Sequence, residues 1–369
     1  DPSTIARVPV DVSERLEKHQ VNPGDILFAR RGEIGRCALV TTAELGWICG
    51  TGSLRARTNS IVAFPEFLIQ VVSSAKSAAW LTEHAVGQTM LNLSTTILGA
   101  LPISLPPLPE QRKIAAILTA VDDAIAATEA VIEQLQVVKK AMMSELLTRG
   151  IPGRHTKFKQ TEIGEIPEEW EARTLGSLFH IQLGKMLDAK ATATFPQFPY
   201  LGNREVQWGK VELGSLRMMN FSEREKEKFS LRQGDLLVCE GGEVGRAALW
   251  YGPPGVYFQK ALHRLRPSSN EALPEYFVHF LRHAAETGQL ADFTSRSSIA
   301  HLTREKLALV RCALPAMAEQ IQIAKALAAI DESVSHREVE KAQLRALKSA
   351  LMSVLLTGEV RVRPAEDGE

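Results

Sequence analysis

Several features that would assign a protein class are missing from this chain of 369 residues. No stretch offers the roughly 18 uncharged apolar residues that a membrane-spanning helix requires, and the start, DPS, has no basic-then-apolar signal pattern. The four cysteines form no C-x-x-C pair, which argues against both a disulfide scaffold and a zinc module. We therefore expect a cytoplasmic protein with reduced, structural cysteines and no membrane contact.

Catalytic signatures are missing as well. The one sequence similar to a phosphate-binding loop, Gly184-Lys185, is followed by methionine and lacks the upstream glycine. The glycines of GEIGR lie in a predicted turn between strands, where chain reversal alone explains them. His279 and His283 have the spacing of metal ligands on a predicted helix, but no third ligand is evident. We expect neither an enzyme nor a chain that binds a cofactor or metal.

The chain also lacks net charge, because 43 lysines and arginines balance 43 aspartates and glutamates. A neutral protein attracts nucleic acid or anionic lipid only weakly as a whole. Segments 21–60 and 231–267 each carry a small local excess of arginine and lysine. Any contact with DNA is therefore expected to depend on local patches.

What the sequence does contain is one large internal repeat. Residues 24–40, GDILFARRGEIGRCALV, match residues 234–250, GDLLVCEGGEVGRAALW, at 9 of 17 positions, where chance would give about one. At an offset of 209 the match continues through two proline-rich elbows, LPPLPEQ (105–111) and LPAMAEQ (314–320), to the helix ends MSELLT and MSVLLT. We expect two copies of one design, each with a mixed globular part, an elbow and a long helix.

The two copies differ at their beginnings. Seventy residues, 164–233, precede the second GDLL after the connector, whereas 23 residues precede the first GDIL. The first copy is therefore expected to lack an opening that corresponds to about residues 164–210.

The long helices show the clearest periodicity. Each is expected to run about 35–40 residues, or roughly 55 Å, and its narrow apolar stripe needs another helix to cover it. A core helix within its own domain is the alternative, and Asp122-Asp123 is assigned to a solvated face. The first stripe is Ile114, Leu118, Val121, Ile125, Thr128, Ile132, Leu135, Met142 and Leu146, with a lapse near Lys139; the second is Ile323, Leu327, Ile330, Val334, Leu344, Leu347, Leu351 and Leu355, interrupted by Arg337 and Lys341.

The globular parts have the pattern of short strands with a few helices. GDILF and GDLLV have strand character, and the following GEIGR and GEVGR indicate a turn into a second strand, which predicts a hairpin. Segments 65–75 and 274–286 begin with proline and carry apolar residues at helical spacing, so both should be helices. The loop 202–210, GNREVQWGK, has the composition of a base reader, although a hairpin with a half-buried tryptophan explains it equally well.

With these motifs together, the chain resembles the specificity subunit of a Type I restriction–modification system. The resemblance rests on the twin GD[IL]L and GE[IV]GR blocks, the twin elbows and the twin helices, and it covers nearly the whole chain. It implies an α+β fold in which two pseudo-symmetric target recognition domains are joined by two long antiparallel coiled-coil helices. The implied parts are a first recognition domain (1–103, its N-terminal part missing), a central helix (104–150), a connector (151–159), a second recognition domain (160–313), a distal helix (314–358) and a tail (359–369).

The resemblance also implies partners and site residues. Each recognition domain would read one half of a bipartite target in double-stranded DNA, two methylation subunits would dock on the helices, and restriction subunits would join through them. The partners would bind S-adenosylmethionine, ATP and Mg. Expected DNA contacts are Arg30, Arg31, Gln88, Thr89 and Asn92 in the first domain and Lys185, Asn203, Arg204, Gln207, Gln259, Lys260, Arg296, Ser297 and Ser298 in the second; expected partner contacts are Glu110, Gln111, Glu319 and Gln320.

Two other classes remain open on the sequence alone. A coiled-coil scaffold that binds only protein would need the same helices but no base-reading loops. An enzyme in its own right would need a catalytic constellation, and none is visible in the motifs.

Overall fold

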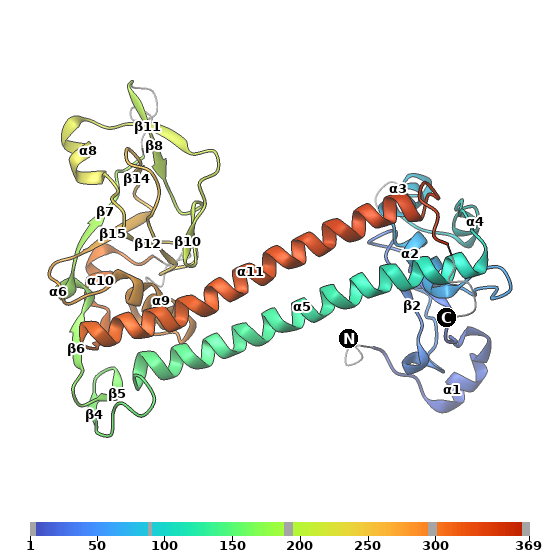
Figure 1. Ribbon diagram of the computed structural model, residues 1–369, viewed down its shortest axis with the longest axis horizontal. Helices are drawn as coiled ribbons and strands as arrows, with labels where there is room; N and C mark the ends of the chain where they lie inside the picture. The colour runs from blue at the N-terminus through green and yellow to red at the C-terminus, as the bar shows by residue number, and fades with distance from the viewer. Residues whose placement is uncertain (1–4, 88–90, 188–194, 294–300, 364–369) are drawn as a thin grey trace. The chain divides into compact units, whose positions relative to one another are not determined.

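The computed structural model describes residues 5–87, 91–187, 195–293 and 301–363. The chain divides into two compact units, one of Asp1–Val131 with Arg337–Glu369 and one of Ile132–His336. The long helices α5 (Leu108–Thr148) and α11 (Met317–Leu355) each contribute one half to each unit (Figure 1). In the part of the chain that the structure describes, no helix has an apolar run that could traverse a bilayer.

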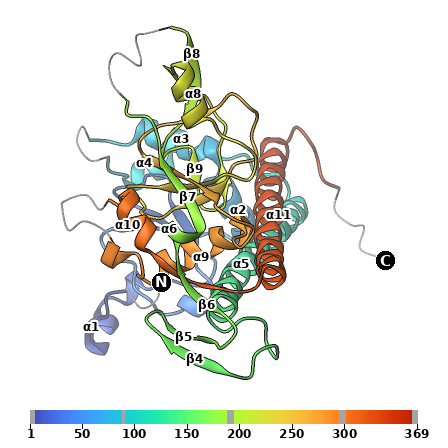
Figure 2. The same ribbon diagram turned by 90° about the vertical axis from the view of Figure 1, so that its left-hand side faces the viewer.

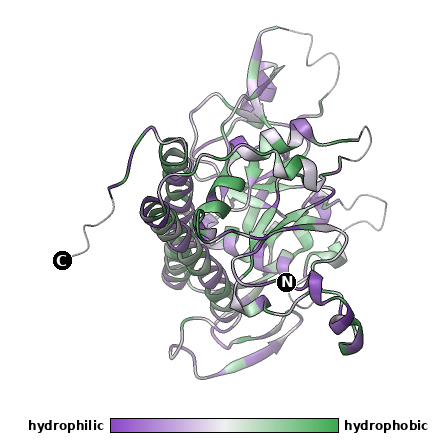
Figure 3. Ribbon diagram, turned by 90° about the vertical axis from the view of Figure 1, so that its right-hand side faces the viewer, coloured by the Kyte–Doolittle hydropathy of each residue, from purple (hydrophilic) through white to green (hydrophobic). Residues whose placement is uncertain are grey.

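The globular part of the first unit is a small antiparallel sheet with helices. Its sheet has the strand order β2-β1-β3, and Ile26 and Phe28 of β1 alternate inward to pack with Val72 and Leu81. Figure 3 shows hydrophilic residues along α1 and a mixture of both kinds along the long helices. The elements are α1 (Val10–Arg15), η2 (Glu17–His19), β1 (Ile26–Ala29), β2 (Cys37–Leu39), η3 (Thr42–Glu44), β3 (Ser53–Ala56), α2 (Pro65–Val72), α3 (Ala75–His84) and α4 (Thr95–Gly99).

The second unit contains a larger version of the same arrangement. Its four-stranded sheet has the order β13-β12-β15-β7, and a second sheet, β11-β8-β14, encloses a separate aromatic cluster around Tyr200, Phe221 and Phe258. The elements are β4 (Phe158–Thr161), β5 (Gly164–Pro167), β6 (Glu171–Thr174), α6 (Leu175–Leu178), β7 (Phe179–Leu183), β8 (Gln197–Leu201), β9 (Val206–Gln207), β10 (Lys210–Val211), β11 (Arg217–Asn220), α8 (Glu223–Phe229), β12 (Leu236–Cys239), β13 (Ala247–Leu249), β14 (Tyr257–Phe258), β15 (Leu262–Pro267), α9 (Pro274–Glu286), η4 (Ala291–Phe293), α10 (Arg304–Leu309) and β16 (Arg311–Leu314).

The internal repeat is visible in the strand pairing. Strands β1, β2 and β3 correspond to β12, β13 and β15, and the pair Ile26–Leu39 has its counterpart in Leu236–Leu249. The predicted hairpins are confirmed, since β1 pairs antiparallel with β2 and β12 with β13. The helices expected at 65–75 and 274–286 are present as α2, with α3 following it, and as α9.

The two long helices pair antiparallel, as the resemblance implied. In the first unit, Ile114 and Leu118 of α5 share a buried cluster with Leu355 near the end of α11. In the second unit, Met143 and Leu147 near the end of α5 share a cluster with Ile323 and others at the start of α11. Each half of one helix therefore packs with the opposite half of the other, and the α+β class with a coiled-coil pair is confirmed.

Polar residues within the helix pair correct three expectations. Lys139 does not mark a lapse, because it is buried in the stripe and paired with Asp331. Its repeat counterpart is Lys348, which binds Asp122 at 2.7 Å, so Asp122 pairs with the other helix although its side chain is 38% exposed. Asp123 is exposed, as expected. Leu347, assigned to the second stripe, is instead 48% exposed, because the adjacent Lys348 takes the inward position.

Candidate nucleic-acid interface

In the second unit, three segments distant in sequence meet at one place. The backbone N–H of Lys185 donates to the carbonyl of Phe258 at 3.1 Å, and that of Lys260 donates to the carbonyl of Lys185 at 2.7 Å. Gln259 N donates to Leu201 O at 3.0 Å, which adds the start of the loop 202–210. β7 and β8, the strands that carry two of these segments, are labelled in Figure 2, which faces this unit. The predicted residues Lys185, Gln259 and Lys260 and the loop 202–210 therefore lie together.

The loop 202–210 is held against β12 and β13. Asn203 Nδ2 donates to the carbonyl of Gly241 at 3.0 Å, and Arg246 Nη2 donates to the carbonyl of Asn203 at 2.7 Å. The indole N–H of Trp208 donates to Glu243, and the hairpin expected here is present as β9 and β10. Gln207 donates to the carbonyl of Arg204 at 2.9 Å. These bonds hold the loop backbone in place, while the Arg204 side chain is exposed to solvent.

The predicted cations of this cluster differ in exposure and in whether they have a hydrogen-bond or ion-pair partner. Arg204 and Lys260 are exposed, and neither side chain has a hydrogen bond or ion pair with a described residue. Lys185, by contrast, is 13% exposed and its ammonium donates to Asn220 O and to Glu225, both at 2.8 Å. Burial acts to raise the pKa of Glu225, but the Lys185 contact and the Ser222 bonds outweigh it and lower that pKa. Lys185 therefore holds the fold at this place, while Arg204 and Lys260 are available to a polyanion.

Two residues of the cluster, Arg217 and Glu205, were not among those predicted from the sequence. Arg217 lies 3.6 Å from Glu205 and 5.2 Å from the centre of the Tyr200 ring. A Cβ atom on Gly202 would approach Arg217 Nη2 to 2.7 Å and Gln259 Nε2 to 3.1 Å, so glycine lets both side chains crowd this point. The first copy offers no counterpart for comparison, and Arg217 and Glu205 come together only through the pairing of β11 with β8.

The first unit brings together three of its predicted residues. Leu93 N donates to the carbonyl of Arg30 at 2.9 Å, and Arg31 and Asn92 form a β-bridge. Arg31 is exposed, whereas Arg30 Nε and Asn92 Oδ1 are buried without a hydrogen-bond partner among the described residues. The predicted Gln88 and Thr89, and Arg296, Ser297 and Ser298 of the second copy, lie outside the described residues.

The second unit repeats this crossing with different side chains. Leu302 N donates to the carbonyl of Glu240 at 2.7 Å, and Gly241 forms a β-bridge with His301. Glu240 and Leu302 are the repeat counterparts of Arg30 and Leu93, so the backbone scaffold is shared. His301 is the repeat counterpart of Asn92. It was not predicted to lie beside Gly241, because the bridge joins segments far apart in sequence.

The elbow residues expected to contact partners are buried in both units. Gln111 accepts from Phe64 N at 2.7 Å and donates to Pro106 O at 2.7 Å, and Gln320 repeats this with Leu273 N at 2.9 Å and Pro315 O at 2.8 Å. Glu110 accepts from Arg361 at 2.7 and 2.8 Å. These side chains hold the elbows together, so a docking surface there has to be made by exposed neighbours.

The second elbow contains a cluster around Glu319. Its carboxylate accepts from Trp170 Nε1 at 3.1 Å and contacts His155 Nε2 at 2.9 Å. The other ring nitrogen of His155 lies 3.0 Å from Glu169. An imidazole with a carboxylate at each nitrogen satisfies both only when it is protonated. This cluster fixes the connector after α5 to the start of α11.

The sequence of this chain matches a known protein family. A sequence model of the Type I restriction modification DNA specificity domain matches twice, at residues 7–137 and 167–346. The chain belongs to this family. Members of the family are DNA-recognition subunits of Type I restriction–modification systems, and this specificity subunit is not itself an enzyme.

Individual relatives agree with the family. The chain is 29% identical over 95% of its length to the MjaX specificity subunit of Methanocaldococcus jannaschii, of which it covers 81%, and 27% identical over 77% to the MjaVIII specificity subunit of the same organism, of which it covers 68%. Among solved structures, a chain from a study of the assembly and conformational transition of the type I R-M system aligns with TM-score 0.59 and 20% identity, covering 92% of this chain and 83% of that one. The S subunit of M. genitalium aligns with TM-score 0.56 and 15% identity, covering 92% and 84%. These structures share the fold.

Proposed function

We propose that this specificity subunit reads one half of a bipartite DNA target with each of its two repeats. The recognition domains are assigned to residues 1–103 and 160–313, the spacer helices to 104–150 and 314–358, with 151–159 as connector and 359–369 as tail. The observation that carries the proposal is the convergence in each unit of polar loop residues onto one edge of the repeated sheet scaffold. Side chains on loops that a rigid sheet holds in place are suited to contact base edges. Because the sheet orients the loops, the side chains can differ between the two repeats.

Within the second domain, we assign base or backbone contact first to Arg204, Lys260 and Gln259. Arg204 and Lys260 are exposed and unpaired among the described residues, and Gln259 lies beside Arg217 at Gly202. In the first domain the corresponding assignment is Arg31. Lys185, Asn203 and Gln207 support the loop backbone, and any base contact by Lys185 would require its pair with Glu225 to open.

The partners are proposed from the family. Methylation subunits would dock on the exposed faces of α5 and α11, since the inward faces are used within the chain, and restriction subunits would join through them. The S-adenosylmethionine, ATP and Mg of the assembled system would be bound by those partners. The protein would act in the cytoplasm, where its DNA target is.

The experiment that tests base reading is a half-site binding assay on the complex with methylation subunits. Arg204→Ala should weaken binding to the target and relax preference in one half-site, with about 1–3 kcal/mol of discrimination lost if the arginine contacts a base edge. Lys157→Ala, which removes an exposed charge from the connector, is the matched control and should leave half-site preference unchanged. Equal losses on both halves and on random DNA would assign Arg204 to the phosphate backbone. An unchanged affinity would remove it from the interface.

A further inference from the structure

A carboxylate lies within the proposed DNA-reading cluster of the second unit. Glu240 directly follows β12, and its backbone N–H donates to the carbonyl of Ala261 at 2.9 Å, next to the exposed Lys260. On its other side, the carbonyl of Gly241 accepts from the Asn203 side chain at 3.0 Å. The Glu240 side chain is half-buried and has no hydrogen bond or ion pair with a described residue. Its negative charge is therefore left unpaired in a cluster that otherwise presents cations.

The first repeat has an arginine at the equivalent position. Arg30 N donates to Gly52 O at 3.0 Å, and Arg30 O accepts from Leu93 N at 2.9 Å. Glu240 repeats both bonds, the second with Leu302 N at 2.7 Å. The Arg30 side chain is also half-buried, and it has no hydrogen bond or ion pair with a described residue. The two repeats therefore hold opposite, unpaired charges on one backbone scaffold.

His263, a neighbour of Glu240 on β15, does not supply a positive charge. It is fully buried, and burial lowers its pKa although the Glu240 carboxylate acts to raise it. The imidazole is therefore uncharged at neutral pH. Its Nε2 donates to Leu302 O at 2.8 Å, which fixes the segment that also binds the Glu240 carbonyl. The backbone around Glu240 is thus held from two sides, while its carboxylate is not neutralised.

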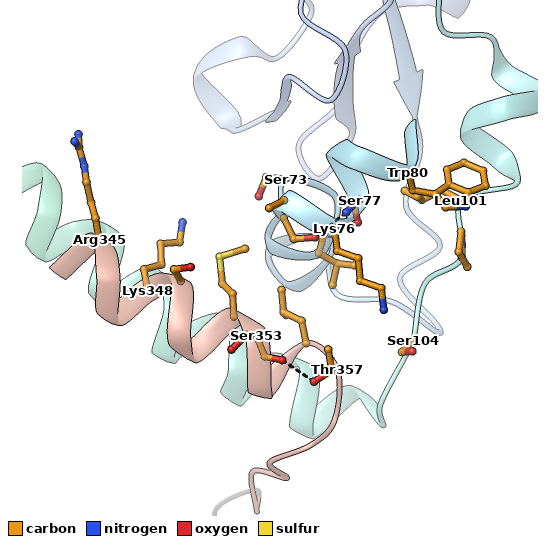
Figure 4. A pocket seen from close by; sticks show the side chains of 17 residues that line it. Ser73, Lys76, Ser77, Trp80, Leu101, Ser104, Arg345, Lys348, Ser353 and Thr357 are labelled. Atoms are coloured by element: carbon orange, nitrogen blue, oxygen red, sulfur yellow. Dashed lines mark hydrogen bonds between the residues drawn. The ribbon is translucent and has the colours of Figure 1, made fainter. Parts of the chain in front are cut away.

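Two cations elsewhere in the molecule show the contrast. Arg345 and Lys348 line a groove of about 690 Å³ in the first unit (Figure 4), and they bind Glu129 and Asp122 of α5. Arg345 keeps its pair at 2.6 Å although its side chain is 59% exposed. Removing a charge from water costs free energy unless the charge is paired. A half-buried charge without a partner in its own chain, such as Glu240, is therefore suited to bind a group of another molecule.

The chemistry of a carboxylate restricts what Glu240 can contact on DNA. It repels phosphates, so it does not strengthen binding to the backbone. In the major groove the donors that it can accept from are the amino groups on cytosine N4 and adenine N6, whereas guanine presents acceptors that suit arginine. We propose that Glu240 is a specificity-determining residue that accepts a hydrogen bond from the amino group of a cytosine or adenine in the half-site that the second repeat reads, the second half-site. This inference rests on the proposed function, and it gives the equivalent positions Arg30 and Glu240 bases of opposite hydrogen-bonding character.

The test uses the complex with methylation subunits and duplexes in which each base pair of the target is replaced in turn. Glu240→Ala should lose about 5- to 150-fold of discrimination at one base pair of the second half-site, because the amino group no longer has its acceptor. The same complex should keep its preference in the first half-site, which shows that the variant is folded. It should bind a random duplex at least as tightly as the wild type, because a charge that repels phosphates is gone. Glu168→Ala, which removes an exposed carboxylate from the turn after β5, is the matched control and should bind every duplex as the wild type does.

A second variant, Glu240→Gln, distinguishes the two bases. Glutamine pairs with N6 and N7 of adenine, so a preference that Glu240→Gln retains and Glu240→Ala loses assigns the amino group to adenine, and a preference that both lose assigns it to cytosine.

Two results would overturn the inference. One is unchanged discrimination by Glu240→Ala at every base pair, and the other is an equal loss of affinity for target and random duplexes, which would give Glu240 a structural role. In either case, a relaxed preference of Arg204→Ala in the second half-site would leave the proposed function standing. A wild-type complex that does not distinguish its target from a random duplex would contradict the proposed function itself.

Discussion

Several arginines that give each repeat its local positive charge form ion pairs or hydrogen bonds within that repeat. Arg57 binds the buried Asp25 at 3.1 Å, and its counterpart Arg266 binds the buried Asp235. Burial acts to raise the pKa of Asp25, but the Arg57 contact and the Asn22 backbone bond outweigh it and lower that pKa. Arg55 donates to Lys18 O at 3.0 Å, and Arg264 to Ser230 O at 2.7 Å. Fewer arginines are therefore free to contact DNA than the sequence count indicates.

His155 supplies a pH-dependent prediction at the same scale. Burial acts to lower its pKa, but the bonds to Glu319 and Glu169 outweigh it, so the pKa is raised above its usual 6.5. Because the pKa of His155 is higher in the folded chain than in the unfolded chain, its protonation stabilises the fold. This stabilisation is complete at pH values below the pKa of the unfolded chain, and it is lost as the pH rises through the pKa of the folded chain. We expect His155→Gln to cost about 1–3 kcal/mol near pH 6 and less near pH 9.

Urea unfolding of wild type and His155→Gln at these two pH values measures the effect. His336→Gln, which replaces an exposed histidine on α11, is the control and should change the free energy of unfolding by less than about 0.5 kcal/mol. A loss of stability in His155→Gln that is the same at both pH values would contradict a protonated bridge.

At the scale of elements, the helix pair is held by a narrow buried stripe. Ile132 is 5% exposed, whereas Val137 on the same helix is 59% exposed. Ile132→Ala should therefore lower the free energy of unfolding by about 2–5 kcal/mol, since it leaves a cavity in the stripe. Val137→Ala should change it by less than about 0.5 kcal/mol. Thermal or urea unfolding compares the two variants, and equal effects would show that the stripe is not the stabilising face.

Much of this element structure could be predicted from local pattern, and the rest could not for identifiable reasons. The 4-3-4-3 stripe and the paired Gly-Asp turns are periodic signals, so the long helices and the β1–β2 hairpin followed from them. Lys139 looked like a break because its partner Asp331 is 192 residues away. Lys185 looked free because Glu225, which binds it, follows 40 residues later. Three of the segments predicted to contact DNA lie together in the structure. Arg217 was not predicted, because its place depends on the pairing of β11 with β8.

At the scale of the whole molecule, zero net charge predicts weak DNA binding by the chain alone. Methylation subunits should raise affinity for target DNA at least about tenfold at roughly 0.15 M salt, because they add phosphate contacts to the few that a chain of zero net charge makes. Anisotropy titrations across a salt series, with and without the partner, measure both the affinity and the salt slope. An isolated chain that binds as tightly and with as steep a slope as the complex would contradict this division.

The repeat also predicts the stoichiometry of the complex. Because α5 and α11 present equivalent outer faces and equivalent elbows, two methylation subunits should bind one chain. Native mass spectrometry of the complex under saturating partner gives the ratio directly. One bound copy, or partner binding that persists when the exposed faces of both helices carry charge reversals, would contradict docking by the repeat.

Two polar layers within the helix pair constrain how its length can change. Lys139 contacts Asp331 in one layer and Lys348 contacts Asp122 in the other, and the lysine and aspartate on each helix are separated by the same 17 residues. His279 lies beside the first layer, and Gln70, its repeat counterpart, donates to Asp122 in the second. A residue added to one helix between these positions would pull one lysine away from its aspartate unless the helix bulged. Insertions that preserve both pairs have to occur in equal number in α5 and α11, so a lengthened spacer is a coupled change in two separate parts of the gene.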